Sequence, residues 1–532
     1  MWRLLGALIL VILWTADGFG PDDSLGLAAA RTGDNECTIV VASGNATIDG
    51  RPILSKNRDI TDPDQKFRYV ARRVTPHDTM YAFIGNFYTD DPVRCYMGVN
   101  EKGFAIINAN CYNLPDVTGD GIDDGLLMRR SLEKCASVED WEHLLNQTNL
   151  TGRQDPWIFG AMDATGSAKL YECSNFYYYE YDAEDADVAP AGVIIRSVFS
   201  VVGWPIDEGA ERYKRAKDLL QARQQFERLS VEYILQDMTR DLYSSLCDPY
   251  PLPFSGRVDS LPPGYVFTGE TINRFRTRSV SVIRGVLPDE DPSLATQFAM
   301  LGPPVLTVAV PLWVAAGSAP AFFWDGPKAP WYQIIEQRMA LLYPYKGIST
   351  WLDTHYLVDD DSSGVFSYSL PLELWGIQQA DLAVEAWRGH PADPELVLQV
   401  QQAIAQEIWQ GFQNENADGL DLEPEIFADH RDSPLKPSAV YRISNHPNPF
   451  NANTAIDISI SGNSGIEFAR VGVYNVLGQL IKELGDVQLR DGAGSVIWDG
   501  IGNSGDPAAS GVYLYRVEAK GIYRTGKMLL LR

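Results

Sequence analysis

The feature that most constrains the fold is a change of hydrophobic pattern along the chain. Residues 37–345 alternate short apolar runs, typical of buried strands, with longer amphipathic runs, typical of helices. Residues 441–532 contain only short runs, separated by turns rich in Asn, Gly and Asp. Strand pairs separated by helix pairs predict an α+β layered domain, whereas regularly spaced short strands predict a small all-β sandwich. We therefore expect two unlike domains within the 532 residues.

Periodicity places the elements of the first domain. Helices are expected over residues 126–147, where Ser137 followed by Asp140 three positions later is a start signal, and over residues 208–246. Further strands are expected at residues 80–84, 104–108, 158–163, 169–173, 192–201, 279–286 and 305–310.

Between the two domains the sequence predicts a helical extension and a linker, and within the last domain it predicts five strands. Residues 346–414 are expected to form a helical extension, because their second half is rich in Gln, Ala, Glu and Leu. Residues 415–440 are acidic and then carry Ser433-Pro and Lys436-Pro, a composition typical of a linker. In the last domain, strands are expected at residues 454–460, 469–474, 494–498, 511–519 and 527–531.

A predicted hairpin brings a cysteine and a carboxylate together. Residues 37–42 and 52–59 read as two strands, with Asp49-Gly50 between them as a turn signal. If Asp49-Gly50 is a two-residue loop, position 37 faces position 62, and a loop over residues 43–50 makes it face position 56. Asp59 lies between these limits, so the hairpin itself places its carboxylate near Cys37.

The N-terminal segment predicts export. A cationic head of three residues precedes an uncharged apolar run over residues 4–14, and eleven helical residues are too short to cross a hydrocarbon core of about 30 Å. We expect residues 1–20 to be a signal peptide and residues 21–36 to be a propeptide or linker. The protein is then secreted or held at the cell surface.

Charge and motif content exclude several function classes. The formal net charge is −26, so phosphate backbones should be repelled and nucleic acid is not an expected partner. The sequence contains no HExxH, no phosphate-binding loop and no dinucleotide fingerprint, so no metal and no cofactor is expected. Six cysteines are too few for a disulfide scaffold; Cys95 and Cys111 could form a bridge in an exported protein or remain buried thiols.

A cysteine that follows a removable segment has a chemical use. If the bond between Glu36 and Cys37 is cut, Cys37 carries both a thiol and an α-amine, so one residue supplies a nucleophile and a base. The alternative is that Cys37 is simply an apolar residue of a buried strand.

The first domain resembles the N-terminal-nucleophile (Ntn) hydrolases of the choloylglycine hydrolase and penicillin acyltransferase group. The resemblance covers residues 37 to about 315 and is carried by residues 37–38, 49–50, 56–59, 98–104, 110, 196–200, 211–216 and 277–283. It implies a four-layer αββα sandwich for this domain. It also implies that residues up to Glu36 are removed by autocatalytic cleavage.

Matched position by position, the resemblance implies roles for four residues. Cys37 is the nucleophile, and Asp59 is the carboxylate that holds its α-amine and orients the attack. Asn110 falls where the family has an oxyanion-hole residue, and Arg212 matches an arginine near the nucleophile. A turn residue is the alternative for Asn110, and a solvated helix-face charge is the alternative for Arg212.

The chain departs from the family pattern at two places. Lys56 stands where relatives carry arginine; Arg58, two positions further along a strand, points to the same face and could substitute. Val198 stands where the second oxyanion asparagine is expected, and a valine side chain cannot donate a hydrogen bond. Ser197 or a backbone N–H would then fill that role, or the activity is reduced or altered.

The last 92 residues resemble the immunoglobulin-like C-terminal sorting module of bacterial surface proteins, of the type IX secretion or FlgD-like kind. The matched pieces are residues 446–451, 473–478, 498–500, 510–513 and 527–531. The resemblance implies delivery or anchoring through the secretion machinery rather than chemistry.

Together these observations predict a secreted amidase that hydrolyses a linear C–N amide through Cys37. Its partners are a small-molecule amide or a peptide substrate and the secretion machinery. Two alternatives remain: a catalytically silent surface binding module, suggested by Val198, and an acyltransferase or dipeptidase of the same fold.

Overall fold

The computed structural model describes two stretches of the chain. It covers residues 36–417 and 441–530, except 62–63, 117–118, 226, 259–260, 345–349, 360–363, 449, 461–465, 476–479, 491, 504 and 520–521. The predicted signal peptide, residues 21–35 of the predicted propeptide and most of the predicted linker therefore lie outside the described residues. Among the helices that are described, none has the length and apolar character needed to cross a membrane.

Cys37 lies in a six-stranded sheet in which every neighbouring pair is antiparallel. In spatial order its strands are β12 (Val193–Arg196), β1 (Glu36–Ala42), β2 (Ile53–Asp59), β14 (Thr277–Arg284), β15 (Thr296–Leu301) and β16 (Val310–Trp313). Every residue of β2 is buried, as expected for a strand covered on both faces.

A second, seven-stranded antiparallel sheet packs against the first. Its order is β11 (Tyr178–Asp182), β10 (Ala168–Cys173), β9 (Trp157–Met162), β8 (Ala105–Asn110), β7 (Met97–Asn100), β6 (Phe83–Tyr88) and β3 (Gln65–Val70). Strands β1 and β2 contact β8 and β9, so the two sheets face each other. Two small ribbons flank them: β4 (Arg73–Thr75) with β5 (Asp78–Met80), and β13 (Tyr265–Phe267) with β17 (Trp351–Asp353).

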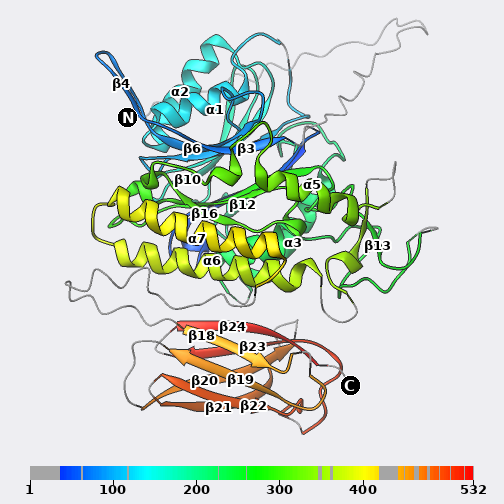
Figure 1. Ribbon diagram of the computed structural model, residues 1–532. Helices are drawn as coiled ribbons and strands as arrows, with labels where there is room; N and C mark the ends of the chain where they lie inside the picture. The colour runs from blue at the N-terminus through cyan, green and yellow to red at the C-terminus, as the bar shows by residue number, and fades with distance from the viewer. Residues whose placement is uncertain are drawn as a thin grey trace, which may run out of the picture. The chain divides into compact units, whose positions relative to one another are not determined.

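Helices cover the outer faces of both sheets (Figure 1). Helices α1 (Asp124–Lys134) and α2 (Val138–Thr151) pack on the seven-stranded sheet, where Trp141 contacts the rings of Phe159 and Tyr171. The six-stranded sheet is covered by α3 (Ala210–Gln224), α5 (Pro330–Leu342), α6 (Val365–Trp387) and α7 (Pro394–Asn414). The predicted four-layer αββα architecture is confirmed, and α6 and α7 of the predicted helical extension share its core.

Local sequence signals set the ends of several helices. Residues 126–147 form two helices rather than one, and the second begins where Ser137 and Asp140 make the predicted capping box. The long helix expected over residues 208–246 ends at Gln224 and is followed by α4 (Val231–Tyr233) and η2 (Ile234–Met238). The remaining single turns are η1 (Gly44–Ala46), η3 (Pro292–Leu294), η4 (Pro304–Leu306), η5 (Val314–Ala316), η6 (Ala321–Phe323) and η7 (Thr354–Tyr356).

Three predicted strands needed correction. Residues 305–310 do not form a strand: Pro303 and Pro304 start the turn η4, and the ladder begins only at Val310. Residues 80–84 are divided between β5 and β6. The strand expected over residues 192–201 stops at Arg196, which frees the next residues to contact the site described below.

The hairpin of β1 and β2 has a register between the two predicted limits. Cys37 pairs with Arg58, and Glu36 pairs with Asp59. The connection is longer than a two-residue turn because the chain first makes the turn η1. A Cβ on Gly44 would lie 2.3 Å from the carbonyl oxygen of Gly50, and Gly50 itself has φ +78°, so this connection requires both glycines.

The C-terminal domain is all-β, as predicted. Its strand order is β18 (Tyr441–His446), β19 (Thr454–Ile460), β22 (Ala493–Trp498), β21 (Leu480–Arg490), β20 (Ile466–Asn475), β23 (Gly511–Ala519) and β24 (Ile522–Leu530). Strands β18 and β21 were not anticipated from the sequence. The core is built around the fully buried Trp498, whose ring contacts Phe450 and Tyr513.

Candidate active site

Cys37 is buried between the two sheets. Its side chain is 4% exposed and lies on the same face as its cross-strand partner Arg58. Lys56, two residues along β2, shares this face and reaches β8 of the other sheet. Burial raises the pKa of the Cys37 thiol, and the Asp59 carboxylate adds to this, whereas Lys56 and Arg58 favour the thiolate. The sulfur therefore faces two cations in a site with little water.

Lys56 is held by a buried polar chain. Its Nζ donates to the carbonyl oxygen of Tyr96 at 2.9 Å and to Oδ1 of Asn108. Asn108 in turn donates from Nδ2 to Oδ2 of Asp124 at 2.6 Å, at the start of α1. Burial lowers the pKa of Lys56 to about 8 and raises the pKa of Asp124 to about 7. Lys56 is therefore mainly cationic at neutral pH.

Arg58 is fixed by neutral groups. Its Nη1 donates to Oε1 of Gln65 and to Oδ1 of Asn86 at 3.1 Å. The guanidinium also lies over the rings of Tyr88 and Tyr96, at 4.4 and 4.0 Å from their centroids. Arg58 thus shares the face of Lys56, as strand alternation predicted, and that of its cross-strand partner Cys37. Hydrogen bonds and ring contacts hold it there.

The opposite face of the hairpin carries Asp59. Its carboxylate is fully buried, and Oδ1 accepts a hydrogen bond from Oγ1 of Thr277 at 2.6 Å. Oδ2 lies 3.9 Å from Nη1 of Arg274 and has no hydrogen-bond donor among the described residues. Burial raises the pKa of Asp59 to about 6, although Arg274 and Arg212 oppose this. A free acceptor oxygen therefore sits beside the Glu36–Cys37 bond.

Glu36, which precedes Cys37, is clamped by two arginines. Its carboxylate pairs with Arg212 and lies 2.8 Å from Nη1 of Arg274. Burial alone would raise the pKa of Glu36, but the two ion pairs hold it below its usual range. Arg212 is fully buried and also pairs with Glu270 at 3.0 Å, so the alternative of a solvated helix-face charge is wrong.

Ser197 and Val198 follow the end of β12. Ser197 donates from Oγ to the carbonyl oxygen of Cys37 at 3.1 Å and accepts from Arg212 at 3.4 Å. Ser197 therefore positions the backbone of Cys37. Continuing the register of β1 and β12 by two residues would place Val198 opposite Cys37. The Val198 side chain is fully buried and cannot donate.

Asn110 is the last residue of β8 and remains partly exposed. Its Nδ2 donates to the hydroxyl of Tyr112 at 3.2 Å, and the backbone N–H of Tyr112 donates to the carbonyl of Val198 at 2.9 Å. Burial raises the pKa of Tyr112, and the charges of Glu36 and Cys37 add to this. Asn110 is thus brought to the site on the side where Val198 lies.

Beyond the groups that hold Lys56 and Arg58, the sequence predicted no role for Tyr112, Glu270, Arg274 and Thr277, which contact Asn110, Arg212, Glu36 and Asp59 in turn. Thr277 begins residues 277–283, which carry part of the family resemblance, so the sequence did offer a signal for Thr277. Arg274 and Glu270 lie in an irregular segment before β14, where no period predicts which side chains turn inward.

All six cysteines are free and buried. Cys95 packs in the outer core under α1 and α2, whereas Cys111 packs in the core on the other side of the sheet. The bridge between them is therefore not formed, and buried thiols are the correct alternative. Burial raises the pKa of Cys95 to about 11 and that of Cys111 to about 12.

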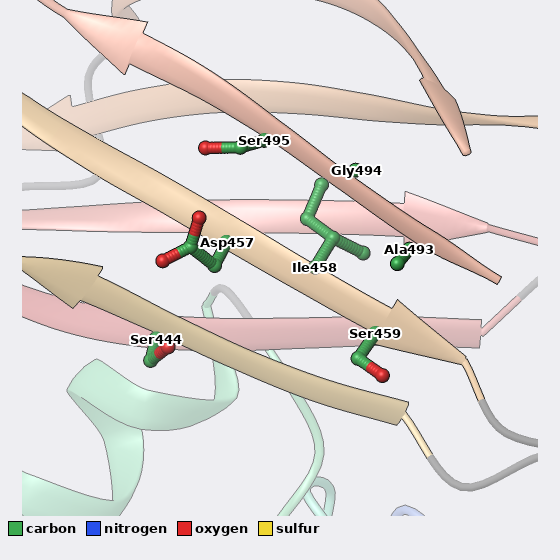
Figure 2. Close-up of a pocket in the computed structure, with 7 residues that line it drawn as sticks. All are labelled: Ser444, Asp457, Ile458, Ser459, Ala493, Gly494 and Ser495. Atoms are coloured by element: carbon green, nitrogen blue, oxygen red, sulfur yellow. The ribbon is translucent and has the colours of Figure 1, made fainter. Parts of the chain in front are cut away.

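A pocket on the C-terminal domain contains none of these residues. Figure 2 shows the residues that line it, Ser444, Asp457, Ile458, Ser459, Ala493, Gly494 and Ser495, on strands β18, β19 and β22. Asp457 is the only ionisable side chain in this lining, and Ser444, Ser459 and Ser495 supply hydroxyl groups.

Comparisons with known proteins agree with the two-domain description. Residues 46–175 match the family profile described as acyl-coenzyme A:6-aminopenicillanic acid acyl-transferase. Residues 444–521 match the FlgD Ig-like domain profile. These matches indicate an acyl-transferase-like segment in the first domain and an immunoglobulin-like C-terminal domain. No curated protein sequence matches the chain.

Three solved structures show likenesses of low overall similarity. A mutant of conjugated bile acid hydrolase from Clostridium perfringens is 15% identical, with 50% of this chain and 89% of that chain covered and a TM-score of 0.30. Penicillin V acylase from Agrobacterium tumefaciens is 14% identical, with 52% and 86% covered and a TM-score of 0.31. Dimeric latent PorU from Porphyromonas gingivalis is 22% identical, with a TM-score of 0.16. That match covers 18% of this chain and spans only 9% of the PorU chain.

Proposed function

We propose that this protein is an Ntn hydrolase that cleaves linear C–N amides with Cys37 as nucleophile. The observation that carries the proposal is the surroundings of the Glu36–Cys37 bond. Asp59 lies opposite Glu36 with a free oxygen, Ser197 holds the Cys37 carbonyl, and Lys56 faces the sulfur. The match to an acyl-transferase family profile supports the same chemistry.

The first step is processing of the chain itself. Cys37 Sγ attacks the carbonyl carbon of Glu36, the C–N bond breaks, and the resulting thioester is hydrolysed by water. Cys37 then carries a free α-amine, which Asp59 Oδ2 is placed to hold. The amine has a reference pKa of about 7.7–8.0, so near neutral pH it can take the proton of the thiol.

Turnover of an external amide follows the same route. The thiolate attacks the amide carbonyl, the amine departs with a proton from the α-ammonium group, and water releases the acid from the thioester. Asn110 Nδ2 is the side-chain donor proposed for the oxyanion, and one such donor typically contributes about 2.7–4 kcal/mol. Lys56 favours the thiolate below its pKa of about 8.

A variant series tests the proposal. Cys37→Ala should abolish both the cleavage and the hydrolysis of acyl-amides, N-acyl amino acids and dipeptides. Cys247→Ala is the matched control, because Cys247 is a buried free thiol outside the site. An active Cys37→Ala protein would contradict the proposal.

Two alternatives have support of their own. Val198, which cannot donate to an oxyanion, favours a catalytically silent binding module; an acyltransferase or dipeptidase would use the same nucleophile. An electrophilic thiol probe separates enzyme from binder, because an activated Cys37 is labelled promptly and once, whereas a silent module is not labelled in the native state. Product analysis with added amines then separates transfer from hydrolysis.

We also propose that the C-terminal domain delivers the protein to the cell surface or the medium through the secretion machinery. The predicted signal peptide and the immunoglobulin-like domain support this. In a bacterium that makes the protein, deletion of residues 441–532 should leave it inside the cell envelope. Unchanged export of the shortened chain would contradict this role.

A further inference from the structure

Glu36 is the one residue of the expected propeptide within the described part of the chain, and it is bound as a ligand would be. Its carboxylate contacts two arginines whose side chains are 0% and 6% exposed, Arg212 and Arg274. Buried cations of this kind require an anionic partner. The Glu36 side chain is itself only 16% exposed, so the carboxylate is largely removed from water.

Cleavage before Cys37 removes this partner. Arg212 then keeps Glu270 at 3.0 Å, and Arg274 keeps Asp59 at 3.9 Å. The same cleavage adds an α-amine beside Asp59. On the face that carries Glu36 and Asp59, two guanidinium groups and one ammonium group then meet two carboxylates, which leaves one positive charge without a counter-charge. The Cys37 thiolate lies on the opposite face, with Lys56 and Arg58. The processed site is therefore suited to one further carboxylate.

The position of that carboxylate relative to the reacting carbon is also fixed. The same sulfur forms a thioester with Glu36 during processing and with the substrate during turnover, so in both thioesters the acyl carbon is bonded to Cys37 Sγ. In Glu36, three carbon atoms separate the backbone carbonyl carbon from the side-chain carboxyl carbon. A glutaryl group has the same three-carbon spacing between its two carbonyl carbons.

Building on the proposed function, we propose that the processed enzyme selects amides whose acyl group ends in a carboxylate. Three carbon atoms separate the carbon of this carboxylate from the reacting carbonyl carbon. Glutaryl and α-glutamyl amides belong to this class. Arg212 and Arg274 bind the terminal carboxylate that Glu36 occupies before cleavage. Cys37 Sγ forms a thioester with the acyl carbon, the C–N bond breaks and the amine leaves protonated. Water then releases the dicarboxylic acid and restores the thiol.

The test compares two anilides that differ only in charge. Processed wild-type protein is assayed with glutaryl-p-nitroanilide and with the analogue in which a neutral carboxamide replaces the terminal carboxylate. Because only the carboxylate makes a charge-assisted interaction with the arginines, we expect kcat/KM to be about 10- to 100-fold higher for the glutaryl compound. Succinyl and adipoyl anilides, one carbon shorter and longer, should be poorer substrates than the glutaryl compound. Arg274→Gln should reduce the glutaryl-to-carboxamide ratio toward one.

A binding measurement gives a second readout. Glutarate should slow the alkylation of Cys37 by iodoacetamide, whereas neutral glutaramide should not. Equal rates for the two anilides, together with no protection by glutarate, would overturn this inference and leave the amidase proposal standing. Failure of the processed protein to hydrolyse any anilide or acyl-amide would contradict the amidase proposal and the substrate class with it.

Discussion

The β1–β2 hairpin and the C-terminal domain both build antiparallel ladders, but among the described residues the hairpin buries charged side chains and the C-terminal domain does not. Strand β2 buries Lys56, Arg58 and Asp59, each at most 2% exposed. The C-terminal domain is centred on Trp498, and its ion pair between Arg470 and Asp486 has side chains 64% and 60% exposed. Burying an ionised group is costly unless it is paired. The first ladder thus buries the charged groups that the proposed chemistry requires, whereas the second encloses an apolar core.

We expect the largest effect on amide hydrolysis from neutralising Asp59. Asp59→Asn keeps the size of the side chain but cannot hold the α-amine as a carboxylate does. Processing should fail, and in any processed fraction kcat/KM should fall about 10²- to 10⁴-fold, the usual contribution of acid–base positioning. Asp457→Asn in the C-terminal domain is the control and should leave amide hydrolysis unchanged. Near-normal turnover by Asp59→Asn would place the chemistry elsewhere.

The apolar core of the C-terminal domain gives the second largest effect. Trp498→Ala should reduce the free energy of unfolding of that domain by about 3–5 kcal/mol, the usual cost of deleting a buried tryptophan. Calorimetry of the full-length protein should show one transition moved to lower temperature. Amide hydrolysis by the first domain should not change at temperatures below that transition. A parallel loss of activity would show that the site depends on this core.

The buried Asp59 should also affect stability in a pH-dependent way. Because its pKa is raised from 3.8 to about 6, the folded uncut chain binds more protons than the unfolded chain between these values. Its contribution to stability is therefore present below about pH 4 and lost as the pH rises through about 6. In the uncut Cys37→Ala protein, adding Asp59→Asn should stabilise the fold at pH 7 by about 1–3 kcal/mol. Chemical denaturation at pH 4 and pH 7 measures this, and a benefit that is larger at pH 4 would contradict the raised pKa.

The exposed ion pair between Arg470 and Asp486 in the C-terminal domain gives the smallest effect. Arg470→Ala should change the free energy of unfolding by less than about 1 kcal/mol, because solvent screens a pair whose side chains are 64% and 60% exposed. Denaturation of the full-length protein at two salt concentrations checks this. A loss comparable to that of Trp498→Ala would mean that charge matters in this domain as it does in the hairpin.

Sequence reasoning predicted what depends on local pattern. The hairpin places Cys37 near Asp59 because strand register has few solutions, and alternation places Arg58 on the face of Lys56. The capping box at Ser137 was readable for the same reason. The resemblance supplied Asn110 and Arg212, which no spacing rule would have selected.

The features that the sequence did not predict depend mainly on contacts between distant segments. Arg274 reaches Glu36 from an irregular stretch before β14, so no period could predict that contact. Arg212 lies on a helix rich in Lys and Arg, and only the packed structure shows that it is buried. Pro303 and Pro304 turned an expected strand into a single helical turn, a result of backbone chemistry that outweighed the apolar pattern.

The intact mass and N-terminal sequence of the purified, active protein would show whether Cys37 is the N-terminal nucleophile. We expect the chain to start at Cys37 with a free α-amine and the Cys37→Ala protein to retain Glu36 and residues before it. An active wild-type protein that still carries Glu36, or whose Cys37 amine is blocked, would contradict it.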